Sequence, residues 1–553
     1  MAHNTEDVRA WLRKNKSRLR DAIRANDHAQ TWQLLDEENA NTECERRTWS
    51  GLLCLAIKRH STPAIWTLLD AGVDPLHVRD EDVGPYSAFT LAAQLGNDTA
   101  LKLLWPRAPP ERHGNDMDTS CLVRAARYGR TSIVSWLLDV WDGWTNETKE
   151  RALRAAVARW EYYVIDLLLR KFTFEEDVLH SVLLRAFRPK DGVEEDTELG
   201  ETQGAVQHDG VDLLHQQRII KRLLMTGLDL NRSPLVHNAV EYIDQVGALQ
   251  TLLENGVNVD AKDYHGETIL HKLASPIYIN DTWGNCEARI HETGIRMAIE
   301  YGASAMIEDN HGRTPLHCAA FGTNASIFHL YLSQVPQGRV EPALANKHGE
   351  TLLHYAAAGG NIDVLDYLLT ADPQRQYLNA RSANGWTPFI CALAPIGSKA
   401  ALRALSTGRL LLDRGAYATV TTDEGWTALH CLAMHRTGGK MCAKLASELV
   451  LRGVPVDSPG SFGAPRRWGF RVRNATKKGA RNKVQRGKTP LHCAAETGAV
   501  AVAKVLLEHN ANVLARDASG NTPLWYAEHS HFPHSIRRER DKMIKLLKES
   551  GGA

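Results

Sequence analysis

The feature that most restricts how this 553-residue chain can fold is a short sequence motif, or phrase, that recurs along it. Each copy has a glycine-bearing turn, a Thr-Pro-Leu-His-like tetrapeptide, small residues and then a leucine-rich stretch. The clearest copies are HGRTPLHCAAFG at 311–322, HGETLLHYAAAGG at 348–360 and GKTPLHCAAETG at 487–498. The leading threonines are Thr268, Thr314, Thr351, Thr387, Thr427, Thr489 and Thr522. Their spacings of 46, 37, 36, 40, 62 and 33 residues indicate a unit of about 33 residues with insertions, and therefore a stack of repeats.

Each part of the phrase predicts a local structure. The threonine is a helix N-cap, and the proline after it suits the first helical position, where its missing N–H has no cost. The alanine pairs allow close packing of a first helix, and leucine-rich stretches such as 364–369 and 502–513 place apolar residues on one face of a second helix. A left-handed helix end is expected after the second helix. The residues expected to provide it are Gly72, Gly256, Gly302, Gly415, Gly453 and Asn510.

This helix, turn, helix and glycine-bearing turn resembles the ankyrin repeat. The resemblance implies an all-α fold, a solenoid of stacked helix-turn-helix units joined by short hairpin loops. We expect a capping helix at 1–18, degenerate repeats at 19–263, clearer repeats at 264–457, further repeats at 487–534 and a second capping helix at 535–553. The copies upstream of 264 lack the Thr-Pro-Leu-His tetrapeptide and are predicted from the helix-pair pattern alone.

Two segments interrupt the repeats. The segment 191–212 contains eight acidic residues and no Lys or Arg, and we interpret it as a surface loop or as a docking strip for a basic partner. The segment 458–486 is basic and contains Trp468 and Phe470 but no acid. Its positive residues are Arg466, Arg467, Arg471, Arg473, Lys477, Lys478, Arg481, Lys483 and Arg486. Three interpretations of this segment remain open: a solvated loop, a nuclear-import signal, and a contact with nucleic acid or an acidic protein.

Motifs for catalysis or for cofactor binding are missing from the sequence. Gly487-Lys488-Thr489 resembles the end of a phosphate-binding loop, but Asn482 stands where that motif needs a glycine. The histidines of the tetrapeptide follow the repeat spacing, which puts them too far apart to share a zinc ion. They are His271, His317, His354, His430 and His492. The family resemblance implies that they hydrogen-bond between turns. We therefore expect no enzyme activity, no cofactor and no metal.

Composition excludes several other classes. The formal net charge of +1 gives no support to general adhesion to nucleic acid or membrane. The start of the chain does not match a secretory signal, and no apolar run reaches the roughly 20 residues that span a bilayer. Nine cysteines form no CxxC pair, and Cys318, Cys391, Cys431 and Cys493 share one place in the repeat, typical of buried side chains in a reducing compartment. We expect an intracellular protein of the cytoplasm, the nucleus or both.

The family resemblance implies a non-enzymatic scaffold or adaptor that holds a protein partner in its concave groove and on its hairpin fingers. Trp386 and Trp426 each follow a turn glycine, and we interpret them either as anchors for a partner or as packing between adjacent hairpins. With Arg313, Glu350 and Lys488, at equivalent places, they form the expected line of contact. The alternatives are an enzyme or accessory protein of a metabolic pathway with a site in the groove, and a nuclear regulator acting through the basic segment. We expect a monomer, with a protein rather than nucleic acid as its main partner.

Overall fold

The structure of the chain is a computed structural model. It describes residues 17–25, 43–70, 87–107, 121–188, 210–230, 235–241, 246–274, 277–280, 286–289, 292–335, 344–372, 374–394, 400–435, 439–462, 485–529 and 537–552, together with isolated positions at 27, 29, 30, 33, 73 and 75. These residues are mostly helical, and consecutive helices pack in pairs, as the repeat pattern predicted. The chain divides into two compact units, Met1–Val257 and Asn258–Ala553.

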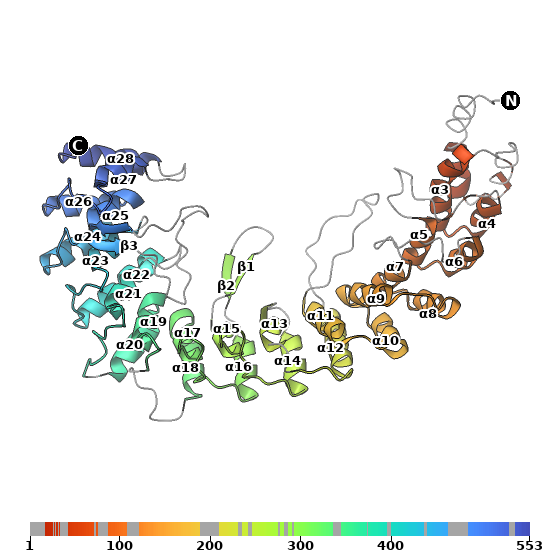
Figure 1. Ribbon diagram of the computed structural model, residues 1–553, viewed down its shortest axis with the longest axis horizontal. Coiled ribbons are helices and arrows are strands. Elements are labelled where there is room, and N and C mark those ends of the chain that lie inside the picture. The colour runs from red at the N-terminus through yellow and green to blue at the C-terminus, as the bar shows by residue number, and fades with distance from the viewer. Residues whose placement is uncertain are drawn as a thin grey trace. The chain divides into compact units, whose positions relative to one another are not determined.

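In the first unit, residues 17–24 are helical and the following helices form pairs. Their bounds are α3 Glu43–Lys58, α4 Thr62–Asp70, α5 Ala88–Leu95, α6 Asp98–Leu104, the short 3-10 helix η1 Trp105–Arg107, α7 Cys121–Arg127, α8 Thr131–Val140, α9 Asn146–Ala158, α10 Tyr162–Lys171, α11 Glu176–Ala186, α12 Gly210–Leu224, α13 Leu235–Glu241 and α14 Val246–Glu254. The first helix of each pair, α5, α7, α9 or α11, packs against the first helix of the next pair, so these helices form one layer (Figure 1).

The second unit repeats this arrangement. Its helices are α15 Ile269–Leu273, α16 Glu292–Glu300, α17 Pro315–Gly322, α18 Ala325–Leu332, α19 Leu352–Gly359, α20 Ile362–Ala371, α21 Pro388–Leu393, α22 Ala400–Asp413, α23 Ala428–Ala433, α24 Gly439–Leu451, α25 Pro490–Thr497, α26 Val500–Glu508, α27 Pro523–His529 and α28 Arg537–Glu549. The odd-numbered helices form the first layer and the even-numbered helices the second, and α28 is the partner of α27 (Figure 1).

Local chemistry explains where the helices begin and end. Thr268, Thr314, Thr351, Thr427 and Thr489 are N-caps in a capping box with the histidine three residues later. The alanine pairs that follow Thr314, Thr351 and Thr489 are fully buried between neighbouring first helices. Left-handed backbone follows the second helices at Gly256, Gly302, Gly415, Gly453 and Asn510, where a glycine or asparagine tolerates a positive φ. The cap predictions are confirmed at these positions, and Gly72 lies outside the described residues.

Two short strand pairs interrupt the helical pattern. Strand β1, Ile277–Asn280, pairs antiparallel with β2, Cys286–Arg289, between α15 and α16, which accounts for the long spacing between Thr268 and Thr314. Strand β3, Gly460–Phe462, pairs antiparallel with β4, Gln485–Lys488. The residues between β3 and β4 include Arg466, Arg467, Arg471, Arg473, Lys477, Lys478, Arg481 and Lys483, and lie outside the described residues. The same holds for 191–209 of the acidic segment, whose last residues begin α12.

Candidate protein-binding surface

The hairpin turns before the first helices of unit 2 share one local structure. We call each turn a finger; five of them are residues 263–268, 309–314, 346–351, 382–387 and 422–427. In the second finger, one carboxylate oxygen of Asp309 accepts hydrogen bonds from the backbone N–H groups of His311 and Arg313, both at 2.8 Å. Asp263 and Asn346 make the same bonds, and the hydroxyls of Ser382 and Thr422 accept from the later N–H only. These side chains replace water as the partners of the turn backbone.

The fingers are also joined to one another by backbone hydrogen bonds. The bonds run from Asn310 N–H to His265 O at 3.0 Å, Lys347 to His311 at 3.1 Å, Ala383 to His348 at 2.7 Å, Asp423 to Asn384 at 3.1 Å and Ser461 to Glu424 at 2.7 Å. Ser461 belongs to β3, so the strand pair that brackets the basic segment is the next finger after 422–427. We call the five fingers and this strand pair the finger row. We call the backbone hydrogen bonds between the fingers the backbone ladder. The ladder fixes the spacing between the tips of neighbouring fingers.

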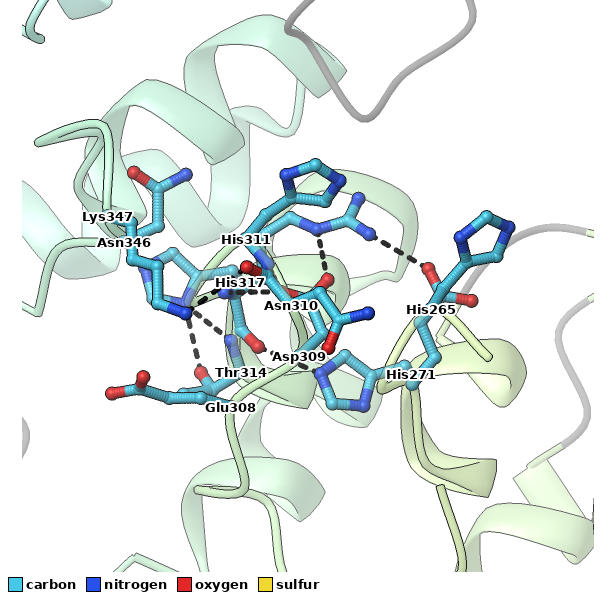
Figure 2. Close-up of polar contacts among 12 residues, drawn as sticks. His265, His271, Glu308, Asp309, Asn310, His311, Thr314, His317, Asn346 and Lys347 are labelled. Atoms are coloured by element: carbon cyan, nitrogen blue, oxygen red, sulfur yellow. Dashed lines mark hydrogen bonds and ion pairs between the residues drawn. The ribbon is translucent and has the colours of Figure 1, made fainter. Parts of the chain in front are cut away.

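The tetrapeptide histidines connect each first helix to the following repeat; for His317 the acceptor is the carbonyl of Leu344, just before the finger at 346–351. The Nδ1 atom of His354 accepts the N–H of Thr351 at 3.0 Å, and its Nε2 atom therefore carries the proton and donates to the carbonyl of Trp386 at 3.1 Å. Burial lowers the pKa of His317, His354 and His430 to about 4, so these rings are neutral near pH 7. Figure 2 shows His271 and His317 beside the finger at 309–314. The predicted structural role of these histidines is confirmed.

A buried ion network links the first two fingers. Arg313 donates from Nε to Asp309 Oδ2 at 2.6 Å and from a terminal nitrogen to Glu267 Oε1 at 2.8 Å. The backbone oxygen of the same residue accepts from His271 at 2.9 Å. Because the Arg313 side chain is only 7% exposed, these partners, rather than water, neutralise it. Arg313 therefore stabilises the finger row from inside.

The two tryptophans of the expected contact line are buried. Trp386 is 6% and Trp426 5% exposed, and their rings lie 6.0 Å apart between neighbouring fingers. The indole N–H of Trp426 donates to the carbonyl of Ser461 at 2.9 Å. Of the two interpretations offered by the sequence, this geometry favours packing between adjacent hairpins.

Arg313, Glu350 and Lys488, the other members of that line, are buried too. Glu350 accepts hydrogen bonds from Asn346 at 2.7 Å and from the Tyr355 hydroxyl at 3.1 Å, and burial raises its pKa. The Lys488 ammonium lies 2.6 Å from Glu496 and 4.0 Å from the centre of the Tyr526 ring. A partner that contacts these side chains has to displace internal partners first, so their role in binding remains a prediction that the burial does not favour.

The exposed side chains of the finger row are those at the tips, which the sequence interpretation missed. Tyr264 is 82% exposed and lies against the ring of His265, and the rings of His311 and His348 lie 6.1 Å apart. The exposed or half-exposed tip residues are Tyr264, His265, Asn310, His311, Lys347, His348, Ala383, Asn384, Asp423 and Glu424. They occupy the two positions between the Asp, Asn, Ser or Thr of the turn and its glycine. That spacing is visible in the sequence and could have identified them.

The rest of the described chain gives no indication of a metal or membrane site. Among the residues that the structure describes, no group of three His, Cys, Asp or Glu could hold a metal ion. No described helix is long and apolar enough to cross a membrane. The four repeat cysteines are buried free thiols, as expected, and burial raises the pKa of Cys318 and Cys431 to about 12.

Comparisons with known proteins agree with this geometry. A family model of three ankyrin repeats matches residues 471–551, and the single ankyrin repeat model matches residues 348–377. Ankyrin repeat and SOCS box protein 6 of Homo sapiens, and the protein of the same name from Pongo abelii, are each 32% identical to the chain over 117 residues. Each match covers 20% of this chain and 26% of the relative's length. The paired helices, the capping boxes and the finger row, together with these matches, make the chain an ankyrin-repeat protein.

Proposed function

We propose that this chain is a non-enzymatic adaptor that holds a protein partner on the finger row and the adjoining first helices of unit 2. The observation that supports the proposal is the backbone ladder between the fingers. It holds the exposed tips in fixed positions, so little conformational entropy is lost when a partner binds. Ankyrin repeats are in general protein-interaction modules. We also propose an intracellular location, since the cysteines that the structure describes as free are buried thiols.

The test compares two variants of the full chain that carry equal numbers of substitutions. The fingertip variant replaces exposed tips by alanine: His265, His311, His348, Asn384 and Glu424. The matched control replaces exposed residues of the second-layer helices α16, α18, α20, α24 and α26 by alanine: Glu300, Ser326, Asp363, Lys444 and Lys504. Both sets leave the buried hydrogen bonds of the fingers in place.

Each protein is used as bait in cell extract, with captured proteins quantified by mass spectrometry and folding checked by circular dichroism. We expect the fingertip variant to lose at least tenfold of one or more proteins that the wild type and the control both retain. Equal capture by all three baits contradicts the proposed surface.

A second candidate function concerns the basic segment, as a contact for an acidic protein or for nucleic acid. It is favoured by the position of β3 and β4, the strands on either side of the segment, which pair with each other in the finger row. A chain in which a two-residue turn replaces 463–484 separates the two candidates. Loss of the same captured proteins as in the fingertip variant assigns the segment to one shared surface, and loss of nuclear retention alone assigns it to a nuclear role.

A further inference from the structure

Two histidines lie next to each other at the tips of neighbouring fingers. The imidazole rings of His311 and His348 have centres 6.1 Å apart and planes inclined by 39°. His311 is exposed and His348 half-exposed, so both rings can be reached from solvent. Each is the residue directly before the turn glycine of its finger. The finger row therefore presents two equivalent side chains with nitrogen donors on one surface.

The backbone of both residues is held in place. A carboxylate oxygen of Asp309 accepts the N–H of His311 at 2.8 Å. The amide oxygen of Asn346 accepts the N–H of His348 at 2.8 Å. The carbonyl of His311 accepts the N–H of Lys347 at 3.1 Å, which joins the two tips directly. Only rotation about side-chain bonds is left to move one ring relative to the other, so the pair is preorganised by its turns.

The separation of the rings suits two ligands of one metal ion. An imidazole nitrogen binds Zn²⁺ at about 2.0–2.1 Å, so the centres of two rings on one tetrahedral ion lie about 5 Å apart. The separation of 6.1 Å between His311 and His348 exceeds this by about 1 Å. Rotation of the exposed rings closes a gap of this size at little cost, because the χ2 torsion of histidine has broad minima.

Neighbouring tips show that the turn does not require histidine. The same place, before the turn glycine, is taken by Asn384 and Glu424 in the later fingers. His265 takes it in the finger before, but its ring centre lies 3.9 Å from that of Tyr264. Figure 2 shows the imidazoles of His265 and His311 directed away from the buried ion network. His265 is therefore an internal reference, an exposed histidine at the same turn position whose ring lies against a tyrosine.

The charges near the pair allow a cation to approach. The buried Arg313 is neutralised by its contacts with Asp309 and Glu267. The ammonium group of Lys347 donates to the backbone carbonyl of Asn310 at 3.2 Å. Its positive charge opposes metal binding, but the group is exposed and water screens it. Two imidazole nitrogens that bind the ion directly outweigh one screened charge.

We propose that His311 and His348 together bind one divalent transition-metal ion of the kind that imidazole prefers, such as Zn²⁺. Among the residues that the structure describes, no group of three His, Cys, Asp or Glu could hold such an ion. The described chain therefore supplies two of the four positions of a tetrahedral ion, and water or a donor group from outside fills the others. An ion held in this way is exchangeable. The site needs no protein partner, so its test is independent of the adaptor function.

The experiment measures how Zn²⁺ protects single histidines of the full chain from modification. Diethyl pyrocarbonate modifies accessible imidazole nitrogens, and peptide mass spectrometry gives the extent at each histidine across a zinc titration. An ion bound to both rings protects both together. Mg²⁺, which prefers oxygen ligands, is the control ion. The test variant is His348→Ala, and the matched control is His265→Ala, at the same place in the finger before.

We expect His311 and His348 to be protected with one common midpoint, at a zinc concentration at least about tenfold below that for His265, because the second ligand belongs to the same molecule. His348→Ala should raise the midpoint of His311 by a similar factor, and His265→Ala should leave it unchanged. The comparison of the three histidines within the wild type does not depend on any variant being folded.

Equal midpoints for the three histidines overturn the site, since zinc then binds exposed imidazoles one by one. Protection of His311 that is unchanged in His348→Ala overturns it too, and so does equal protection by Mg²⁺. A midpoint that falls as the protein concentration rises has the same consequence, because the ligands then come from two copies of the chain.

Discussion

The Nε2 atom of His354 lies 3.1 Å from the carbonyl oxygen of Trp386, a residue 32 positions later and in the next repeat. The same ring accepts the N–H of Thr351 through Nδ1, so one neutral imidazole closes a helix N-terminus and fastens the following finger. Equivalent bonds reach Arg313 O from His271, Lys488 O from His430 and Asn521 O from His492. This hydrogen bond from a histidine to the next repeat therefore recurs with the period of the sequence.

Replacement of His354 by glutamine is expected to lower the free energy of unfolding by about 1–3 kcal/mol. The reason is that glutamine leaves the buried Thr351 N–H or the Trp386 carbonyl without its partner. Urea unfolding followed by circular dichroism measures the effect. His311→Gln is the control, since that histidine is exposed at a fingertip, and it should change stability by less than about 0.5 kcal/mol. Equal losses in the two variants would contradict the structural role.

Stability is expected to fall as the pH is lowered from about 6.5 to 4. His317, His354 and His430 have pKa values of about 4 in the folded chain, against about 6.5 in an unfolded one. Between pH 4 and 6.5 the unfolded chain binds more protons than the folded chain, so a lower pH favours unfolding. Above pH 6.5 these histidines do not change the free energy of unfolding with pH. Melting temperatures across pH 4–8 test this. The His354→Gln variant should show a smaller pH slope than wild type over the same window.

Replacement of the buried Arg313 is expected to lower the free energy of unfolding far more than replacement of the half-exposed Arg381. Arg313→Met removes the partner of Asp309, whose side chain is fully buried, and should destabilise the chain by about 3 kcal/mol. Arg381 pairs with Asp423 at 3.2 Å, but both side chains are about half exposed, so Arg381→Met should cost less than about 1 kcal/mol. Denaturant titrations of both variants provide the comparison. A loss at Arg313 no larger than that at Arg381 is the outcome that rejects this interpretation.

Residues 463–484 are expected to be dispensable for folding. The pairing of Phe462 with Gln485 and of Gly460 with Lys488 closes the finger without them, so an Asn-Gly turn can join the two strands. The shortened chain should melt within a few degrees of wild type, since it loses no described contact of the finger row and closes a shorter loop. Differential scanning calorimetry measures this. A large drop in melting temperature would mean that the basic segment is part of the folded core.

The sequence was sufficient to predict the repeats because their determinants are local. A threonine and a histidine three residues apart close a helix N-terminus, as at Thr314 and His317, with no long-range information. Strand β4 was not predicted, because the hydrogen-bond partners of Gln485–Lys488 lie more than 20 residues earlier, in β3. A short strand of this kind exists only through its partner.

The sequence by itself determined the period, the helix ends and the buried faces of this ankyrin-repeat protein, since each depends on neighbours within a few residues. The tertiary structure decided which finger side chains reach the surface. Trp386, Trp426 and Lys488 stand at places where an isolated hairpin would expose them, yet the neighbouring fingers and helices bury them. The tip residues beside the turn glycines remain exposed because the ladder uses only their backbone. Burial of a turn side chain is set by the repeat stacked on it, and that neighbour lies about 33 or more residues away.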